Sequence, residues 1–251
     1  MLLSSEEAEV FKIINPDGKS DFLLVCDHAS NRVPKSLNNL GLTDGQLNDH
    51  IAWDPGAAQV ALKLSQLLDA TLVMSCFSRL VVDCNRALVS PQLIAPISDG
   101  IKVPANQDLT DEERQQRIDT FFKPYHYAIE SILDQRNGRS TTLLSIHSFS
   151  PALAESGEDL ARPWHIGLSF KEYDKLINHL YAELMKDKQL CVGYHQPYAV
   201  DEEFDYTLIE HGFKQNLEHG MVEIRQDQLA TEKSAEMWAQ RLHIALNEAV
   251  V

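Results

Sequence analysis

The feature that most constrains this chain is an alternation of short apolar runs, rich in β-branched residues, with segments whose apolar residues recur at helical spacing. Strands separated by helices need crossover connections, so this pattern predicts an α/β fold with a mixed, largely parallel sheet. The 251 residues contain no internal repeat and no linker-like stretch. We therefore expect a single domain that spans residues 1–251.

The predicted elements are short and regularly spaced. Strands are predicted over residues 22–26, 70–76, 79–84, 141–146, 164–170, 190–194 and 220–225. Helices are predicted over residues 55–69, 110–137 and 171–187, followed by a C-terminal helix that begins near Thr231. Asp54 is a plausible N-cap for the first helix, whereas Thr110 begins a capping box for the second. Pro124 should bend or split that second helix, and Gly138 should end it.

The segment 87–110 has no hydrophobic periodicity and carries three prolines and a glycine. It is predicted to be a long loop, and loops of this length inside a compact domain are often functional.

Composition and charge exclude several classes of protein. No apolar run approaches 18 residues and the mean hydropathy is −0.25, which argues against a membrane span. The net charge of −15 would repel a phosphate backbone, so nucleic acid is not an expected partner. The first twenty residues lack the features of a secretory signal, and the four cysteines show no C-x-x-C spacing. We expect a cytoplasmic protein with reduced thiols.

Polar residues gather at the ends of four predicted strands, at positions 27–32, 78–86, 147–148 and 223–225. Ligands of open α/β sheets bind at the carboxyl ends of the strands, so these clusters are expected to converge. His28 and His147 belong to two of them. Either histidine alone could simply anchor a loop. Together with one oxygen ligand they would form a catalytic zinc site with an open position for water.

Charged residues in the other two clusters each have two interpretations. Glu223 lies inside the apolar segment GMVEIR, where an unpaired carboxylate is costly to bury. It is either half of a buried ion pair, with Arg225 or another arginine, or a catalytic group. Arg79 and Arg86 flank the apolar segment 80–84, and their planar guanidinium groups suit an anionic substrate. The alternative is that either arginine pairs with an acid such as Asp83 and fixes the loop.

Several segments together resemble the N-formylglutamate amidohydrolase family. In chain order they are FLLVCDHASNRVP, HIAWDPGA, SRLVVDCNR, PYHYAI, LLSIHSFSP, RPWHIGL and MVEIRQD. The resemblance runs from about residue 22 to residue 230. It implies a three-layer phosphorylase/hydrolase-like fold, distantly similar to the zinc carboxypeptidases, and metal-assisted cleavage of an N-acyl amino acid.

The same resemblance implies a set of metal ligands. The carboxypeptidase zinc motif maps onto His28, Asn31 and His147, with one zinc ion expected as the cofactor. Asn31 departs from that motif, because a glutamate is usual there and a neutral amide is a poorer zinc donor than a carboxylate. Asp54 or Asp27 could supply the missing carboxylate.

Further roles follow from the resemblance and from the residue chemistry. Asn85 and Arg86 correspond to an Asn-Arg pair that holds the substrate carboxylate. Glu223 corresponds to the general base, and we expect Arg79 to stabilise the developing oxyanion. The expected substrate is a small anionic N-acyl amino acid such as N-formylglutamate. A second hypothesis keeps the fold but makes the protein a metal-poor, non-catalytic binder of acidic small molecules, which the amide of Asn31 would favour. The sequence leaves the acyl group, the metal and the oligomeric state open.

Overall fold

The computed structural model describes residues 2–7, 9–136, 138–152, 162–173 and 175–247. Its centre is a seven-stranded sheet in the order β1-β3-β2-β6-β9-β7-β8. These strands are β1 (Phe11–Ile14), β2 (Phe22–Cys26), β3 (Thr71–Ser75), β6 (Thr142–Phe149), β7 (Ile166–Ser169), β8 (Val192–Tyr194) and β9 (Glu218–Arg225). The four adjacent strands β3, β2, β6 and β9 are mutually parallel, whereas β1 and β7 run antiparallel to their neighbours β3 and β9. The sheet is therefore mixed and largely parallel, as predicted.

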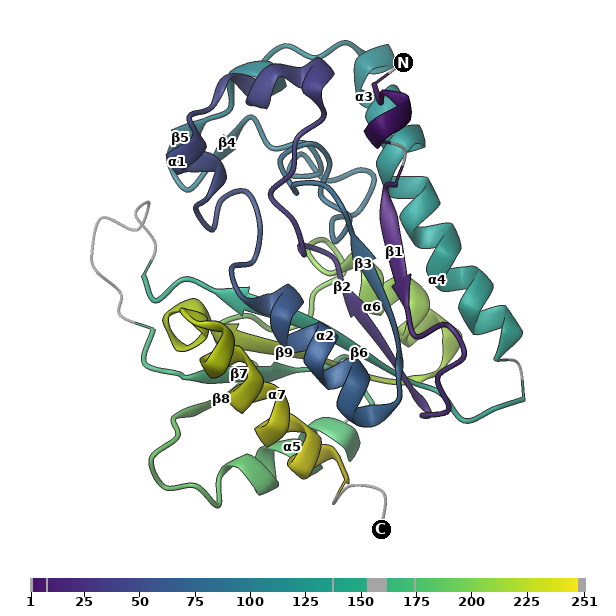
Figure 1. Ribbon diagram of the computed structural model, residues 1–251, viewed down its shortest axis with the longest axis vertical. Coiled ribbons are helices and arrows are strands. Elements are labelled where there is room, and N and C mark those ends of the chain that lie inside the picture. The colour runs from purple at the N-terminus through teal and green to yellow at the C-terminus, as the bar shows by residue number, and fades with distance from the viewer. Residues whose placement is uncertain (1, 8, 137, 153–161, 174, 248–251) are drawn as a thin grey trace.

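Helices cover both faces of this sheet and give three layers (Figure 1). The helices are α1 (Asp44–Leu47), α2 (Ala57–Leu68), α3 (Asp111–Arg117), α4 (Lys123–Gln135), α5 (Lys175–Leu184), α6 (Tyr206–His211) and α7 (Glu232–Asn247). Helices α2, α5 and α7 pack on one face, and α4 and α6 pack on the other. No helix in the described part of the chain is long and apolar enough to cross a membrane.

The period of the central strands explains the two packed faces. Along β2, Leu24 and Cys26 join the apolar cluster under α2 and α7, whereas Leu23 and Val25 join the cluster under α4 and α6. Successive side chains of a strand point to opposite faces, so a strand covered on both sides must be apolar throughout. All five residues of β2 are buried accordingly.

A third apolar cluster lies over the carboxyl ends of the parallel strands, between the segments that follow β2 and β3. It includes Leu80, Val81 and Val82 from the segment 79–84, which we expected to be a strand. That expectation is wrong, because Leu80 and Val81 lie in a turn, Val82 has no regular structure, and all three are buried without belonging to a strand. A short apolar run indicates that the segment is buried, but hydrophobic periodicity alone cannot distinguish a strand from a buried segment without regular structure. The short hairpin of β4 (Ile97–Ser98) and β5 (Ile101–Lys102) lies in the predicted long loop.

The helical predictions hold with local changes. Thr110 forms the predicted capping box with Glu113. A π-helical turn over Ile118–Phe122 joins α3 to α4, and Pro124 lies in the first turn of α4. Helix α2 begins later than expected, after Gly56 with a φ of 84°, so Asp54 is not its N-cap. The side chain of Asp54 is turned toward the site described below.

The structure also contains a strand that the sequence did not predict, and another strand extends farther than predicted into the site. The edge strand β1 shows no strong pattern in the sequence, because two of its four residues are exposed and the other two are only partly buried. Strand β6 extends to Phe149, three residues beyond the predicted end at residue 146. His147 therefore lies within the sheet and not in a loop after it.

Candidate active site

The register of the parallel strands brings two predicted site residues together. His147 of β6 lies directly opposite Glu223 of β9. Residues paired across adjacent strands project from the same face of a sheet. Asp27 and His28 follow β2, the neighbour of β6 on its other side. The carboxyl ends of three adjacent strands thus deliver these side chains to one place, which is the convergence that the sequence predicted.

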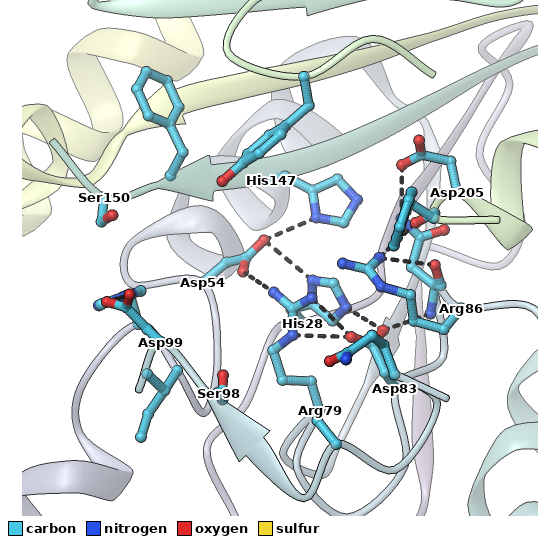
Figure 2. A pocket seen from close by; sticks show the side chains of 18 of the residues that line it. His28, Asp54, Arg79, Asp83, Arg86, Ser98, Asp99, His147, Ser150 and Asp205 are labelled. Atoms are coloured by element: carbon cyan, nitrogen blue, oxygen red, sulfur yellow. Dashed lines mark hydrogen bonds and ion pairs between the residues drawn. The ribbon is translucent and has the colours of Figure 1, made fainter. Parts of the chain in front are cut away.

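His28, His147 and Asp54 form the centre of the site (Figure 2). One nitrogen of each histidine and one oxygen of Asp54 all lie within 4.8 Å of one another, and all three residues are buried. The Asp54 Oδ2 atom is 2.8 Å from His147 Nδ1 and 3.4 Å from His28 Nδ1. Two imidazoles and one carboxylate are a donor set typical of catalytic zinc, so these residues fit a divalent ion.

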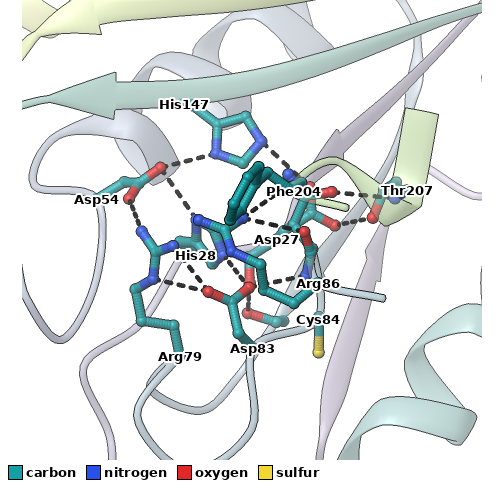
Figure 3. Close-up of polar contacts among 12 residues, drawn as sticks. Asp27, His28, Asp54, Arg79, Asp83, Cys84, Arg86, His147, Phe204 and Thr207 are labelled. Carbon is teal, nitrogen blue, oxygen red and sulfur yellow. Dashed lines mark hydrogen bonds and ion pairs between the residues drawn. The ribbon is translucent and has the colours of Figure 1, made fainter. Parts of the chain in front are cut away.

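The remaining nitrogen of each histidine contacts a second carboxylate (Figure 3). His28 Nε2 donates to Asp83 Oδ1 at 2.7 Å, and His147 Nε2 lies 3.2 Å from Asp27 Oδ2. Asp27 Oδ1 in turn accepts a hydrogen bond from Thr207 Oγ1 at 2.6 Å. Carboxylates behind metal-binding histidines commonly fix the ring and place the proton on the far nitrogen. The arrangement leaves both Nδ1 atoms facing Asp54.

Asn31 does not lie in this group. Its amide nitrogen donates to Leu47 O at 3.0 Å and to Asn48 Oδ1 at 2.9 Å. Asn31 is also not among the residues that line the cavity of the site. The carboxylate oxygen that lies beside the two histidines belongs to Asp54, one of the two residues that the sequence left open. Asp27, the other, lies behind His147.

Burial and charge act against each other at the histidines. Burial lowers the pKa of His147, but hydrogen bonds to Asp27 and Asp54 outweigh it and hold the pKa well above the ordinary value. Burial and Arg79 lower the pKa of His28, whereas Asp83 and Asp54 raise it to a net value above normal. The pKa of Asp54 is held far below its usual range, because its charged histidine neighbours overcome the effect of burial. The two imidazoles and the carboxylate therefore stabilise one another's charged forms.

Glu223 lines the same cavity and is buried, with 7% of its surface exposed. Its Oε2 atom has no hydrogen-bond partner among the described residues. Burial raises the pKa of Glu223 to about 7, with Asp54 and Asp205 adding to the rise and His147 opposing it. Arg225 does not pair with it, because that guanidinium contacts Asp227 at 2.7 Å and 3.1 Å. The ion pair with Arg225, which was one of the two interpretations of Glu223 from the sequence, is therefore absent.

Arg79 lines the cavity and is also tied to the carboxylate network. Its Nη2 atom lies 2.7 Å from Asp83 Oδ2, and its Nη1 atom lies 3.6 Å from Asp54 Oδ1. The structure thus contains the loop-fixing pair with Asp83 that the sequence offered as an alternative. The guanidinium still reaches the cavity beside the histidines.

Arg86 lies on the opposite side of the cavity from the hairpin residues Ser98 and Asp99 (Figure 2), and Asn85 lines the cavity as well. The Asn85 side chain donates to Asp205 Oδ1 at 3.3 Å and accepts from Thr207 N at 3.0 Å, so it holds the segment before α6. Arg86 donates from Nη1 to the carbonyl oxygens of Asn85 and Phe204. The guanidinium of Arg86 lines the cavity, and its charge helps to lower the pKa of Asp83.

The cavity has a volume of about 920 Å³. Two carboxylates of the site were not predicted as functional: Asp83 behind His28, and Asp205, on whose carboxyl group the charge of Arg86 acts. Asp27 and Asp83 belong to polar clusters that the sequence marked at strand ends, which is a usable signal. Asp205 stands in a segment with no comparable pattern.

The chain was compared with protein families and with solved structures. The family model described as N-formylglutamate amidohydrolase matches residues 20–230. No curated protein matches the chain. The crystal structure of a gene product from Agrobacterium tumefaciens is 34% identical in sequence, with a TM-score of 0.94 over 100% of this chain and 98% of that one.

A more distant structure carries the name of the family. It is an N-formylglutamate amidohydrolase from Ralstonia eutropha, 18% identical, with a TM-score of 0.68 over 96% of this chain and 97% of that one. At this identity the likeness concerns the fold alone, whereas the family model covers most of the sequence. The predicted resemblance is confirmed, and the chain belongs to the N-formylglutamate amidohydrolase family of hydrolases.

Proposed function

We propose that this protein hydrolyses the amide bond of an N-formyl or other small N-acyl amino acid with the help of one divalent metal ion, of which zinc suits the donor set best. The observation that carries the proposal is the convergence of His28, His147 and Asp54 within 4.8 Å, beside a buried Glu223 with an unpartnered oxygen. A buried carboxylate without a partner is costly, and such groups concentrate at active sites.

The roles of the residues follow from their positions. His28 Nδ1, His147 Nδ1 and Asp54 would hold the ion, which when bound acidifies a water molecule and polarises a carbonyl group. Glu223, with a pKa of about 7, can accept a proton from the attacking water and pass it to the leaving amine. Arg79 donates to the oxygen on which negative charge develops, while Asp83 fixes its orientation.

Arg86 would bind the carboxylate of the amino acid. Because two of its hydrogen bonds go to backbone carbonyl oxygens, its side chain is held in place before the substrate arrives. The amide of Asn85 is occupied by Asp205 and Thr207, so we assign it to positioning Arg86 and the segment before α6.

The alternative of a metal-poor binding protein loses its main support. It rested on the neutral amide of Asn31 as a ligand, and the oxygen beside the two histidines belongs to the carboxylate of Asp54.

The experiment that tests the proposed function is an assay for free amino acid released from a panel of N-formyl and N-acetyl amino acids, with zinc-loaded protein and with chelated protein. We expect release that depends on zinc. Ligand binding without any product from the zinc-loaded protein would favour the alternative.

A further inference from the structure

Thr207, in the first turn of α6, is fully buried and belongs to the hydrogen-bond network behind the histidines (Figure 3). Its Oγ1 atom donates to Asp27 Oδ1 at 2.6 Å, across a separation of 180 residues in the chain. Threonine hydroxyls commonly bond to backbone groups within a few residues. The hydroxyl of Thr207 is instead directed at a carboxylate of the site.

The other oxygen of Asp27 contacts the ring of His147. Asp27 Oδ2 lies 3.2 Å from His147 Nε2 and accepts a hydrogen bond from Ser145 Oγ at 3.2 Å. Ser145 Oγ also lies 2.8 Å from His147 Nε2. The terminal torsion of an aspartate is soft, so a carboxylate keeps one orientation when both of its oxygens are bound. The Asp27 carboxylate therefore stands between Thr207 and His147, and Thr207 holds the oxygen that faces away from the ring.

The backbone of Thr207 connects to the other histidine. Thr207 N donates to Asn85 Oδ1 at 3.0 Å. Asn85 N donates to Asp83 Oδ1 at 2.9 Å, and the same oxygen accepts from His28 Nε2 at 2.7 Å. One residue of α6 is thus linked to both carboxylates that lie behind the histidines.

The residues just before Thr207 contact the groups that we propose to bind and position the substrate carboxylate. Phe204 O accepts a hydrogen bond from Arg86 Nη1, and Asp205 Oδ1 accepts one from Asn85 Nδ2 at 3.3 Å. The start of α6 therefore contacts this part of the site directly and the histidines through the Thr207 hydroxyl. A side chain that ties α6 to Asp27 holds these two parts of the site together.

We propose that Thr207 is a positioning residue of the metal site, whose hydroxyl holds Asp27, and through Asp27 the ring of His147, in the orientation that binds the ion. Thr207 does not line the cavity, so it acts through the residues that it bonds. The inference rests on the metal dependence in the proposed function. It adds a residue that lies outside the polar clusters at the strand ends.

The test compares the zinc affinities of full-chain variants, measured by competition with a chromophoric chelator. Thr207→Val keeps the shape of the side chain and removes the hydroxyl, whereas Thr207→Ser keeps the hydroxyl. Because partners behind metal-binding histidines contribute to metal affinity, the valine variant should raise the Kd for zinc about tenfold and the serine variant less than about twofold. If the valine variant does not fold, Thr207→Ala makes the same comparison.

Thr71→Val is the matched control. Thr71 is also a buried threonine, and its hydroxyl accepts from Arg136 Nη2 at 3.2 Å at the start of β3, away from the cavity. It should keep the wild-type Kd for zinc, whatever its melting temperature. An unchanged Kd in Thr207→Val would overturn the inference and leave the proposed function standing. A wild-type protein that binds no zinc would overturn both.

A double-mutant cycle shows whether Thr207 acts through Asp27. Asp27→Ala removes the acceptor of the Thr207 hydroxyl, so adding Thr207→Val to this variant should change the Kd for zinc little further. The two substitutions should therefore be strongly non-additive in their effect on zinc affinity. Additive effects would mean that Thr207 acts on the packing of α6 in general, and the assignment to Asp27 and His147 would be wrong.

Discussion

Glu223 has a buried carboxylate oxygen without a described partner, and its environment raises its pKa to about 7. If it is the general base, Glu223→Gln keeps the shape and removes the proton acceptor, so kcat should fall roughly 10²- to 10⁴-fold. Because the carboxylate has no ion-pair partner to lose, the melting temperature should stay the same or rise. Steady-state kinetics and thermal unfolding measure both effects.

Glu218→Gln is the matched control for this change. Glu218 begins the same strand and accepts a hydrogen bond from Leu176 N at 2.9 Å, which glutamine can replace. It should retain activity. A Glu223→Gln protein that is destabilised yet proportionately active would refute the assignment of the base.

The identity of the oxygen ligand can be tested by metal analysis. Asp54→Ala and His28→Ala should each lower zinc affinity by at least about tenfold, because each removes one of three converging ligand atoms. Asn31→Ala should retain zinc, since the Asn31 amide contacts Leu47 and Asn48 instead. Zinc content after dialysis against a weak chelator ranks the variants by their affinity for zinc. Loss of zinc from Asn31→Ala alone would restore the ligand set expected from the sequence.

Arg86 can be tested by a substitution that keeps the charge. Arg86→Lys loses the planar fork and the two backbone hydrogen bonds, so KM for an N-acyl amino acid should rise more than kcat falls. Arg241→Lys serves as the control, because Arg241 pairs with Asp187 in a partly buried contact on α7. Unchanged kinetics in Arg86→Lys would make Arg86 purely structural.

At the scale of elements, α4 and α6 meet through a buried pair of histidines. His126 Nε2 donates to Cys84 O at 2.8 Å, so its Nδ1 accepts from His211 Nε2 at 3.0 Å. Burial lowers the pKa of His126 to about 3, with the nearby His211 adding to it, and burial lowers the pKa of His211 to about 4. His126 must be neutral for its Nδ1 to accept this hydrogen bond, and the low pKa values keep both rings neutral near pH 7.

Stability should therefore fall in acid. Both folded-state pKa values lie below the ordinary value of 6.5. The contribution of the two neutral histidines to the free energy of unfolding is therefore complete above pH 6.5 and is lost as the pH falls toward 4. For each histidine that stays neutral in the folded state, the free energy of unfolding falls by about 1.4 kcal/mol for every pH unit below the pKa of that histidine in the unfolded chain. Denaturant unfolding of His126→Gln should be measured between pH 7.5 and pH 5. In this range the variant should take up about one proton fewer on unfolding than the wild type does. His243→Gln, on α7, should match the wild type, and equal slopes in all three proteins would contradict the prediction.

At the scale of the whole molecule, the buried carboxylates and histidines of the site should couple metal binding to stability. A ligand at one hundred times its Kd stabilises the native state by about 2.7 kcal/mol. For a chain of this size that corresponds to a rise in Tm of roughly 5 to 10 °C. Zinc should produce this rise and a chelator should reverse it. Asp54→Asn should show a much smaller rise, and an undiminished one would place the zinc elsewhere.

Much of the architecture could be predicted because it depends on local patterns. The uniform apolar character of β2 predicts a strand buried on both faces, and Thr110 with Glu113 predicts the start of α3. Residues 79–84 could not be assigned correctly, since burial under the long loop and burial in a sheet demand the same apolar side chains. The polar clusters predicted a site at the strand ends, because the carboxyl ends of parallel strands meet at one edge.

The sequence by itself determined the fold class, the location of the site and most of its members, since strand period and the residues at strand ends are local properties. Only the tertiary structure decided which side chains are turned toward one another. Asp54 reaches the histidines because its backbone N–H bonds to His28 O and α2 begins two residues later than expected. Arg79 turns to Asp83, and Glu223 lies opposite His147 through the register of β6 and β9. These relations join residues far apart in the chain, and packing, rather than any local propensity, sets them.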